Sequence, residues 1–482
     1  MDKPDSDIGA EYETKSELRQ IRPNGRPTEV ETDHVTARRV RTKIDLIVLS
    51  TISLIWNAAK AGLLKDLKMT SYQFSVVLSI FFVPYMTVEM VSNFLVRKIG
   101  AHIFVTGLIL AWGIVETFQG FVTSYEGLIV CRVFLGLTEG PLIPAAVLYL
   151  SEWYKRHELQ QRMAVLFSAT SLAGAFSGLL AFAIIHLDGK GGKPGWRHLD
   201  FLPGRYCHHH HRSCRLLWLP KDIASARFLT EKEKAVALAR LEEDMTLNEA
   251  GEEFRFSSVW SALRAPHVLI LSTSCFYVGY LIFGLAYFLP TVVGSLGYSP
   301  AKTQLYGVPP FACGFVVSLA AALFSDKYHC RGLVAIGASF LALGGFIMMY
   351  KSINVHVRYG SLFAQTIGVS VLTPCTVTWV PNNVMPHYRR ATAIALVFIA
   401  GSAGGLLATW MYHDAPHFYK TTRVNIGLTV AYILQCAVGI AYLHYQNLQK
   451  AKERAMHQNI PDEDSEAKRA LGDKHRDFIY TL

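Results

Sequence analysis

The stretch GLIVCRVFLGLTEGPLIPAAVLYL, residues 127–150, contains 24 residues, of which only Arg132 and Glu139 carry a charge. An α-helix needs about 20 mostly apolar residues to cross the hydrocarbon core of a bilayer. The stretch is therefore long and apolar enough to span a membrane. Charged side chains inside a membrane are costly and usually face a cavity or a partner, so we expect Arg132 and Glu139 to face the interior of a helix bundle.

Further runs of similar length and composition lie on either side of this stretch. They are residues 74–95, 103–121, 163–185, 268–290, 305–324, 333–350, 361–380, 391–411 and 424–443. One more run, residues 44–64, is weaker because it contains Asn57 and Lys60. Backbone polar groups in lipid must be satisfied internally, so each run is predicted to be a helix.

The composition of the whole chain also indicates a membrane protein. Charged residues make up 17% of the 482 residues, whereas soluble domains carry about 25%. The net charge of +10 falls in short clusters between the apolar runs. This distribution is typical of cytoplasmic loops and not of the basic patch of a nucleic-acid-binding protein. We predict an all-α protein of the lipid bilayer that binds no nucleic acid.

The lysine and arginine clusters predict the orientation of the helices. They alternate correctly if both termini are cytoplasmic, which requires an even number of spans, but the runs number eleven. The missing span should lie at residues 198–219, HLDFLPGRYCHHHHRSCRLLWL. That stretch has the right length, but each of its arginines would cost about 2.5–3.5 kcal/mol near a helix centre.

Residues 198–219 have two interpretations. The tract of Cys207, His208–His211 and Cys214 has the composition of a metal site but no Cys-x-x-Cys pair or established zinc spacing. We predict that it binds no metal and interpret the stretch as an error in the gene model, such as a shifted reading frame. An in-frame transcript that encodes it would disprove this interpretation.

The apolar runs and the charged stretches between them divide the chain into five predicted segments. They are a disordered cytoplasmic N-terminal tail (1–43), an N-terminal transmembrane half (44–219), a central cytoplasmic loop (220–267), a C-terminal transmembrane half (268–446) and a cytoplasmic C-terminal tail (447–482). Thr230 and Glu233 form a capping-box pattern that predicts a helix in the central loop. Residues 462–477 are charged and poor in aromatic residues, which predicts disorder.

The arrangement of Arg132 and Glu139 suits transport chemistry. They are seven residues apart, so they share one face of a helix, and Glu139 falls at the midpoint of its span, where transporter sites lie. A guanidinium can bind both oxygens of a carboxylate substrate, and a partly buried glutamate can carry a proton. An ion pair that only holds helices together is the alternative. Gly136 and Gly140 on the same span predict close helix packing.

Several segments carry a family resemblance. In the first half they are AGLLKDL (61–67), SIFFVPYMTVEMVSNFLVRKIG (79–100), CRVFLGLTEGPLIPAAVLYLSEWYKRHELQQR (131–162) and LDGKGGKPGWR (187–197). In the second half they are YFLPTVVGSLGYS (287–299), LFSDKYHCRG (323–332), WVPNNVMPHYRRATAIAL (379–396) and DAP (414–416). Together they resemble the major facilitator superfamily and, within it, fungal anion:cation symporters related to allantoate, nicotinate and pantothenate permeases. The resemblance implies the major facilitator fold of two six-helix bundles and proton-coupled import of a small organic anion at the plasma membrane.

The resemblance also implies roles for individual residues. Coupling residues of the family match Arg132, for substrate binding, and Glu139, for proton transfer. Substrate or gate contacts are implied for Trp379, Asn382 and Asn383, although Trp379 is equally suited to anchor its helix end at the interface. Tyr287 is a weaker candidate for stacking on an aromatic acid.

Further charged residues are predicted to act in conformational switching or at the membrane interface. The resemblance implies a charged inter-helix latch of Asp326, Lys327 and Arg331. Glu89, in the inner third of its span, is predicted to form a gate with Arg97. Glu116, at the outer end of its span, is predicted to lie at the interface.

We therefore predict a monomeric transporter that works by alternating access and needs no cofactor. Nicotinate, pantothenate, allantoate and small dicarboxylates would all fit Arg132. An enzyme is not supported, because the intramembrane charged residues contain no nucleophile–base pair and no metal cluster. The alternative is a non-transporting nutrient sensor, an inactive paralogue or a misassembled gene model. It rests on the disrupted sixth span and on LIWNAAKAGL (54–63), which lacks the Asp–Arg pair usual in the family.

Overall fold

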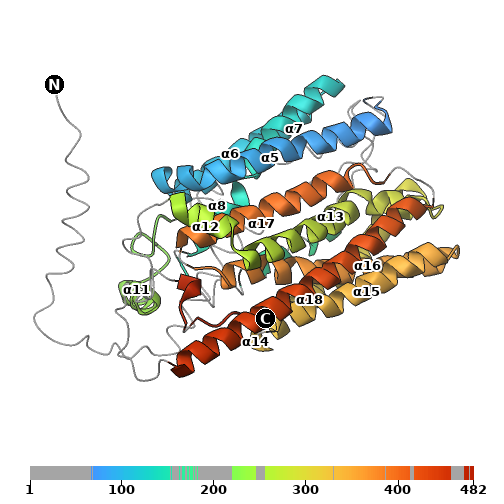
Figure 1. Cartoon of the computed structure of the whole chain (residues 1–482). Helices are drawn as coiled ribbons and strands as arrows, with labels where there is room; N and C mark the ends of the chain where they lie inside the picture. Colours follow the sequence, from blue (N-terminus) through green and yellow to red (C-terminus); the bar gives the residue numbers. More distant parts are fainter. Residues whose placement is uncertain are drawn as a thin grey trace, which may run out of the picture.

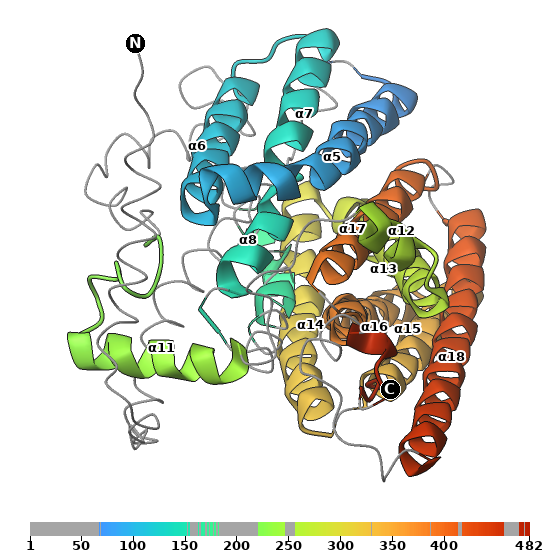
Figure 2. The ribbon, with the colours of Figure 1, turned by 60° about the vertical axis from the view of Figure 1, so that its left-hand side comes forward.

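The computed structural model shows an elongated bundle of helices (Figure 1). The residues that it describes are 67, 69–151, parts of 153–182, 220–245, 256–328, 330–385, 387–412, 417–456, 472–476 and 478–482. Within this part of the chain, four helices precede the central loop and six follow it. Figure 2 shows α5, α6 and α7 of the first group on one side and the second group on the other.

The helices have the following bounds. The first group contains α5 (Ser71–Ile99), α6 (Ala101–Gln119), α7 (Tyr125–Glu139), α8 (Leu142–Ser151) and the described helical residues between 162 and 182. The second group contains α13 (Pro266–Gly294), α14 (Pro300–Tyr328), α15 (Arg331–Lys351), α16 (Val355–Asn382), α17 (His387–Ala408) and α18 (Tyr419–Met456). Between the groups lie α11 (Glu231–Met245) and α12 (Phe256–Leu263).

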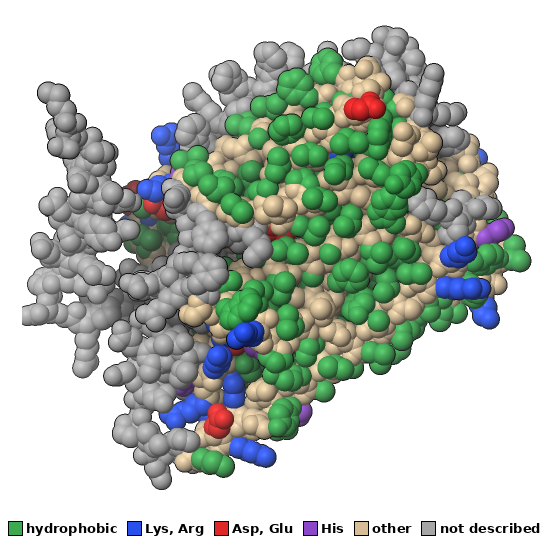
Figure 3. All heavy atoms as spheres, turned by 45° about the horizontal axis from the view of Figure 1, so that its top comes forward, with side chains coloured by type: hydrophobic (Ala, Val, Ile, Leu, Met, Phe, Trp, Pro, Cys, Tyr) green, Lys and Arg blue, Asp and Glu red, His purple; other side chains and the backbone are tan. Residues whose placement is uncertain are grey.

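Nine helices in the described residues are long and apolar enough to cross a membrane. They coincide with nine of the ten clear runs in the sequence, and α7 and α8 together account for residues 127–150. The run at 163–185 is described only in part, and residues 44–64 and 198–219 lie outside the described residues. Figure 3 shows hydrophobic side chains across the middle of one face, with most of the visible lysine and arginine side chains toward its ends.

Local sequence explains where several helices begin. At the start of α5 the Thr70 hydroxyl accepts a bond from the Gln73 N–H at 3.2 Å, and the Gln73 side chain accepts one from the Thr70 N–H at 2.9 Å, which completes a capping box. Gly100 separates α5 from α6 with a φ of 89°, a conformation that glycine adopts without strain. The capping box predicted at Thr230 and Glu233 is confirmed by reciprocal bonds of 3.0 and 3.4 Å at the start of α11.

The bundle has two distinguishable ends. We call the end that carries α11, α12 and the C-terminus the loop end, and the opposite one the far end (Figure 1). Chain direction then places the first residues of α13, α15 and α17 and the last residues of α14 and α16 at the loop end.

The two helix groups contact each other at several levels of the bundle. At the far end, the Ser75 hydroxyl donates to the Thr409 carbonyl oxygen at 2.8 Å. Nearer the loop end, the Ser171 hydroxyl donates to the Ser370 hydroxyl at 2.8 Å. Further contacts between the groups are the ring pairs Tyr72–Trp410, Phe82–Phe283 and Phe167–Phe398 and the hydroxyl pair Ser168–Ser318.

The C-terminal end of the chain differs from the prediction of a disordered tail. The last transmembrane helix, α18, continues to Met456, so residues 447–456 of the predicted tail are helical. Gly472–Lys474 form a short 3-10 helix, η4, in which Asp473 is fully buried. Composition missed this order because the charge of Asp473 is balanced by basic residues that are distant in the sequence.

Candidate functional site

The span that contains Arg132 and Glu139 lacks some of its regular helical hydrogen bonds near its centre. α7 ends at Glu139, α8 begins at Leu142, and Gly140 and Pro141 lie between them. Proline cannot donate an N–H to the helical ladder, which favours a break at this point. Gly140 keeps an α-helical conformation, so one span runs from Tyr125 to Val147. Glu139 lies near the centre of this span, the level at which transporter sites lie.

Close packing against α5 positions this helix. A Cβ atom on Gly136 would lie 2.8 Å from Cγ of Pro84, and one on Gly140 would lie 2.7 Å from the carbonyl oxygen of Tyr85. The absence of side chains at these two positions allows the backbones to approach. The predicted packing role of Gly136 and Gly140 is confirmed.

Three of the predicted site residues come together where the two helix groups meet. Arg132 and Glu139 interact electrostatically with each other and with Tyr287 of α13. All three side chains are partly exposed. Tyr85 of α5 interacts electrostatically with Glu139 and Tyr287. Side chains from α5 and α7 of the first group and from α13 of the second group thus form one candidate site.

Aromatic rings border this candidate site. Phe283 stacks on Tyr287 with ring centroids 5.9 Å apart, and it meets Phe82 edge to face at 5.2 Å. Phe81 and Tyr85 on α5 have ring centroids 5.4 Å apart. These side chains belong to one apolar cluster that also includes a residue of α7. The site therefore combines one cation, one carboxyl group and aromatic surfaces from both helix groups.

Glu116 is buried, three residues before the end of α6, and its position at the membrane interface stays a prediction. Only 6% of its surface is exposed, and its carboxylate accepts a bond from Gln119 Nε2 at 3.1 Å. It interacts electrostatically with Glu139. The reason is that α6 packs against α7, so this part of α6 is covered by protein.

Glu89 is buried on α5, one helical turn from Tyr85. It has no exposed surface, and neither carboxylate oxygen has a hydrogen-bond partner among the residues that the structure describes. The side chain of Arg97, its predicted gate partner, lies outside the described residues. The gate therefore stays a prediction.

Trp379, Asn382 and Asn383 lie at the loop end, and Arg132 and Glu139 do not. The Trp379 indole N–H donates to the Thr481 carbonyl oxygen at 2.9 Å. The Asn383 side chain donates to the same oxygen at 3.0 Å and accepts the Thr481 N–H at 2.8 Å. The chain's own C-terminus thus occupies Trp379 and Asn383, and their contact with substrate stays a prediction.

The predicted latch residues differ in their environments. Lys327 is exposed, with its ammonium group 5.4 Å from the centre of the Tyr328 ring. Arg331 is 2% exposed. The Asp326 side chain lies outside the described residues. The latch also stays a prediction.

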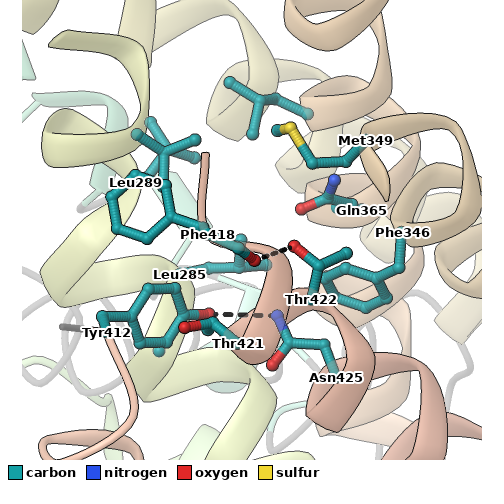
Figure 4. Close-up of a pocket in the computed structure, with 13 residues that line it drawn as sticks. Leu285, Leu289, Phe346, Met349, Gln365, Tyr412, Phe418, Thr421, Thr422 and Asn425 are labelled. Atoms are coloured by element: carbon teal, nitrogen blue, oxygen red, sulfur yellow. Dashed lines mark hydrogen bonds between the residues drawn. The ribbon is translucent and has the colours of Figure 1, made fainter. Parts of the chain in front are cut away.

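A separate small pocket lies inside the second helix group (Figure 4). The described residues that line it include no acidic or basic side chain. Its polar lining comes from Gln365, Tyr412, Thr421, Thr422 and Asn425. Without a cation the pocket lacks the group that an anion site needs, so we do not place substrate there.

Hydrogen bonds beside this pocket support a stability prediction. The Tyr280 hydroxyl donates to Asn425 Oδ1 at 2.9 Å, and both residues are buried. A Tyr280→Phe substitution leaves Asn425 Oδ1 without this donor, which should cost about 1–3 kcal/mol. We expect a lower melting temperature in detergent, whereas Tyr445→Phe, at an exposed tyrosine, should change it little. Equal melting temperatures for the two variants would contradict the prediction.

Sequence reasoning missed Tyr85 and Phe283. Tyr85 lies within the motif at 79–100, four residues before Glu89. It was missed because an uncharged tyrosine does not stand out in an apolar run. Phe283 lies four residues before Tyr287, on the same face of α13. A candidate site at Tyr287 therefore predicts that Phe283 also faces it.

The model of the family described as Major Facilitator Superfamily matches residues 46–204 and 213–409, more than half of the chain. The gap in this match, residues 205–212, falls inside the anomalous stretch at 198–219. The match includes Arg132 and Glu139.

Three curated relatives cover most of this chain. An uncharacterized transporter of Schizosaccharomyces pombe is 32% identical over 434 residues, which are 89% of this chain and 87% of the relative. The MFS-type transporter cnsO of Penicillium expansum is 31% identical over 82% of this chain and 80% of its own length. The high-affinity nicotinic acid transporter of Saccharomyces cerevisiae is 26% identical over 93% of this chain and 85% of its own length.

Proposed function

Because the chain belongs to the Major Facilitator Superfamily and is a membrane transporter, we propose that it moves a small organic anion across the membrane together with a proton. The proposal rests on one observation. Arg132 and Glu139 share one helix of the first group and interact electrostatically with Tyr287 of the other helix group. A substrate bound there would contact both groups, as alternating access requires.

The residues of the site have complementary roles in this proposal. The Arg132 guanidinium binds the carboxylate of the substrate through two parallel hydrogen bonds. The Glu139 carboxylate takes up one proton from the side from which substrate enters and releases it on the other side. Phe283 and Tyr287 pack against the apolar part of the substrate. Anion and proton cross together, so the cycle moves no net charge for a monovalent anion.

The aromatic border favours a flat organic acid. Nicotinate fits this chemistry and is the substrate named for the relative from Saccharomyces cerevisiae, so it is the first compound to test. Lys327, Arg389 and Arg390 lie at the loop end, which supports a cytoplasmic position for that end. We propose, from the positions of the basic clusters in the sequence, that both termini are cytoplasmic. We propose a monomer in the plasma membrane.

Uptake measurements in yeast test this function. The chain is expressed beside a version in which residues 198–219 are replaced by an apolar span, and radiolabelled nicotinate, pantothenate and allantoate are supplied at several external pH values. We expect uptake of one acid that rises as the external pH falls. No uptake by either version, despite confirmed surface expression, would favour the alternative of a sensor or inactive paralogue. The gap in the family match at residues 205–212 is the observation that supports this alternative.

The Arg132→Ala variant should transport poorly. Loss of a charge-assisted bidentate contact removes about 1.5–3 kcal/mol of binding, which is about a 10- to 150-fold rise in the substrate concentration for half-maximal uptake. Arg132→Lys should restore part of the loss, because the charge remains without the fork geometry. Arg423→Ala, at an exposed arginine on α18, is the control. Unchanged uptake kinetics in Arg132→Ala would remove this residue from the site.

A further inference from the structure

Glu89 is a buried carboxyl group that the proposed roles of Arg132 and Glu139 do not use. It has no exposed surface, and neither of its carboxyl oxygens has a hydrogen-bond partner among the residues that the structure describes. An ionised carboxylate that is buried without a partner is very unfavourable, whereas a neutral acid costs much less. In the arrangement that the structure shows, Glu89 therefore holds a proton.

The packing of α5 against α7 fixes the level of Glu89 relative to Glu139. The two helices lie side by side (Figure 2) and run in the same direction, because Val77 and Leu128 share one apolar cluster near the far end and Gly140 approaches Tyr85 further along. A Cβ atom on Gly140 would lie 2.7 Å from the Tyr85 carbonyl oxygen, so the neighbouring Glu139 is level with Tyr85. Glu89 comes four residues after Tyr85, which is about 6 Å nearer the loop end.

Arg132 lies on the opposite side of Glu139. It comes seven residues earlier on α7, which is about 10 Å nearer the far end. From the far end to the loop end, the order is therefore Arg132, then Glu139 with Tyr85, then Glu89. The cation that suits a substrate carboxylate lies on the far side of Glu139, and a second carboxyl group lies on its loop-end side.

Tyr85 connects the two carboxyl groups. It lies one turn before Glu89 on the same face of α5, and it interacts electrostatically with both Glu89 and Glu139. A phenol hydroxyl is both a donor and an acceptor of hydrogen bonds. Tyr85 can therefore accept a proton at its oxygen while it gives up its own.

The helices that pack against α5 bring no other charged side chain to the level of Glu89 in the described part of the chain. These helices are α6, α7, α8 and α17. Apart from Arg132 and Glu139, their described charged and histidine side chains all lie within the first or last four residues of a helix: His102, Glu116, Glu126, Arg389 and Arg390. Tyr85 is thus the group through which Glu89 exchanges a proton with the candidate site.

We propose that Glu89 is a second proton-binding residue of the transporter and that Tyr85 passes a proton to it from Glu139. In this step the Glu139 carboxylic acid gives its proton to the Tyr85 hydroxyl oxygen, and the Tyr85 hydroxyl gives its own proton to the Glu89 carboxylate, directly or through one water. Glu139 becomes a carboxylate, Glu89 becomes a carboxylic acid, and Tyr85 is unchanged. The proton has then moved one helical turn toward the loop end.

This step also links the proton to release of the substrate. Glu139 interacts electrostatically with Arg132, so its regained negative charge competes with the substrate carboxylate for the guanidinium. Glu89 then gives up its proton when the loop end opens to water. The inference rests on the proposed proton coupling, but its test uses no substrate, so a failure to find the transported acid does not decide it.

Infrared difference spectroscopy of the full chain in lipid vesicles tests whether Glu89 holds a proton. Because a carboxylic acid absorbs apart from a carboxylate, we expect a carboxylic-acid band at neutral pH that Glu89→Gln removes. Glu89→Asp should shift the band, which assigns it even if Glu89→Gln does not fold. Glu126→Gln, at an exposed residue of α7, should leave it unchanged. Absence of the band would show that Glu89 is ionised, as the predicted gate with Arg97 requires, and would overturn the proposal.

An acid jump on one side of the membrane tests the transfer. Vesicles in which the far end faces outward are equilibrated at a pH high enough to remove the Glu89 band, and only the outside is then acidified. We expect the band to return at least about tenfold more slowly in Tyr85→Phe and Glu139→Gln than in the parent. Tyr72→Phe, at an exposed tyrosine of α5, and Glu126→Gln should match the parent. Equal rates in the parent and Tyr85→Phe would exclude the transfer through Tyr85, and a band that does not return in the parent would make Glu89 a structural acid.

Discussion

Glu139→Gln is expected to abolish proton-driven accumulation of the substrate while exchange of labelled for unlabelled substrate continues. Glutamine has nearly the same shape as glutamate but cannot bind and release a proton in the physiological range. With one proton carried per monovalent anion, each unit of pH difference supports about tenfold accumulation, or about 1.4 kcal/mol. The variant should lose all of this gradient-dependent accumulation. Uptake into vesicles with an imposed pH difference measures proton-driven accumulation. Counterflow without a pH difference measures exchange of labelled for unlabelled substrate.

The same helix provides a control for this prediction. Glu126 lies in the first turn of α7 and is exposed, so Glu126→Gln should transport like the parent. Acid-stimulated accumulation that survives in Glu139→Gln would exclude Glu139 as the proton carrier. Glu89, fully buried and without a hydrogen-bond partner in the described residues, would then be the next carboxyl group to replace. Loss of counterflow as well would mean that the variant damages binding or folding.

Gly404→Leu is expected to prevent folding of the second helix group. A Cβ atom at Gly404 would lie against the Phe276 carbonyl oxygen and 2.7 Å from the Tyr280 nitrogen. Both obstacles are backbone atoms of α13, which cannot turn away as a side chain can. The cost should exceed the usual 1–3 kcal/mol of overpacking and approach the whole net stability of about 5–15 kcal/mol. Yield of monodisperse protein and its thermal unfolding in detergent are the measurements.

A second glycine on the surface of the same group serves as the control. A Cβ atom at Gly337 of α15 would meet nothing within 4 Å, so Gly337→Leu adds the same side chain into open space. We expect normal yield from this variant. Normal yield from Gly404→Leu would mean that α13 and α17 separate more readily than their packing indicates. Gly279→Leu, whose Cβ would meet the backbone of Gly401, would test the same crossing from the other helix.

The sequence located the helices and the two charged residues of α7 because both depend on local properties. Hydropathy over about 20 residues decides whether a segment spans, and Arg132 and Glu139 stand out as charges in an apolar run. The same reasoning did not show that Glu116 is buried where α6 packs against α7. It also predicted disorder at the C-terminus, where Asp473 is buried. The burial of both side chains depends on how helices pack, which local sequence does not show.

The sequence by itself thus determined the membrane class, the family resemblance and the pairing of Arg132 with Glu139 on one helix face. Only the tertiary structure decided that Tyr287 of the other helix group joins them, and that the end of the chain fills the loop end at Trp379 and Asn383. The physical reason is that helix periodicity fixes neighbours within a few turns. Contacts between distant segments depend on how closely backbones approach, at positions such as Gly136 and Gly404, and on which buried charge finds its partner.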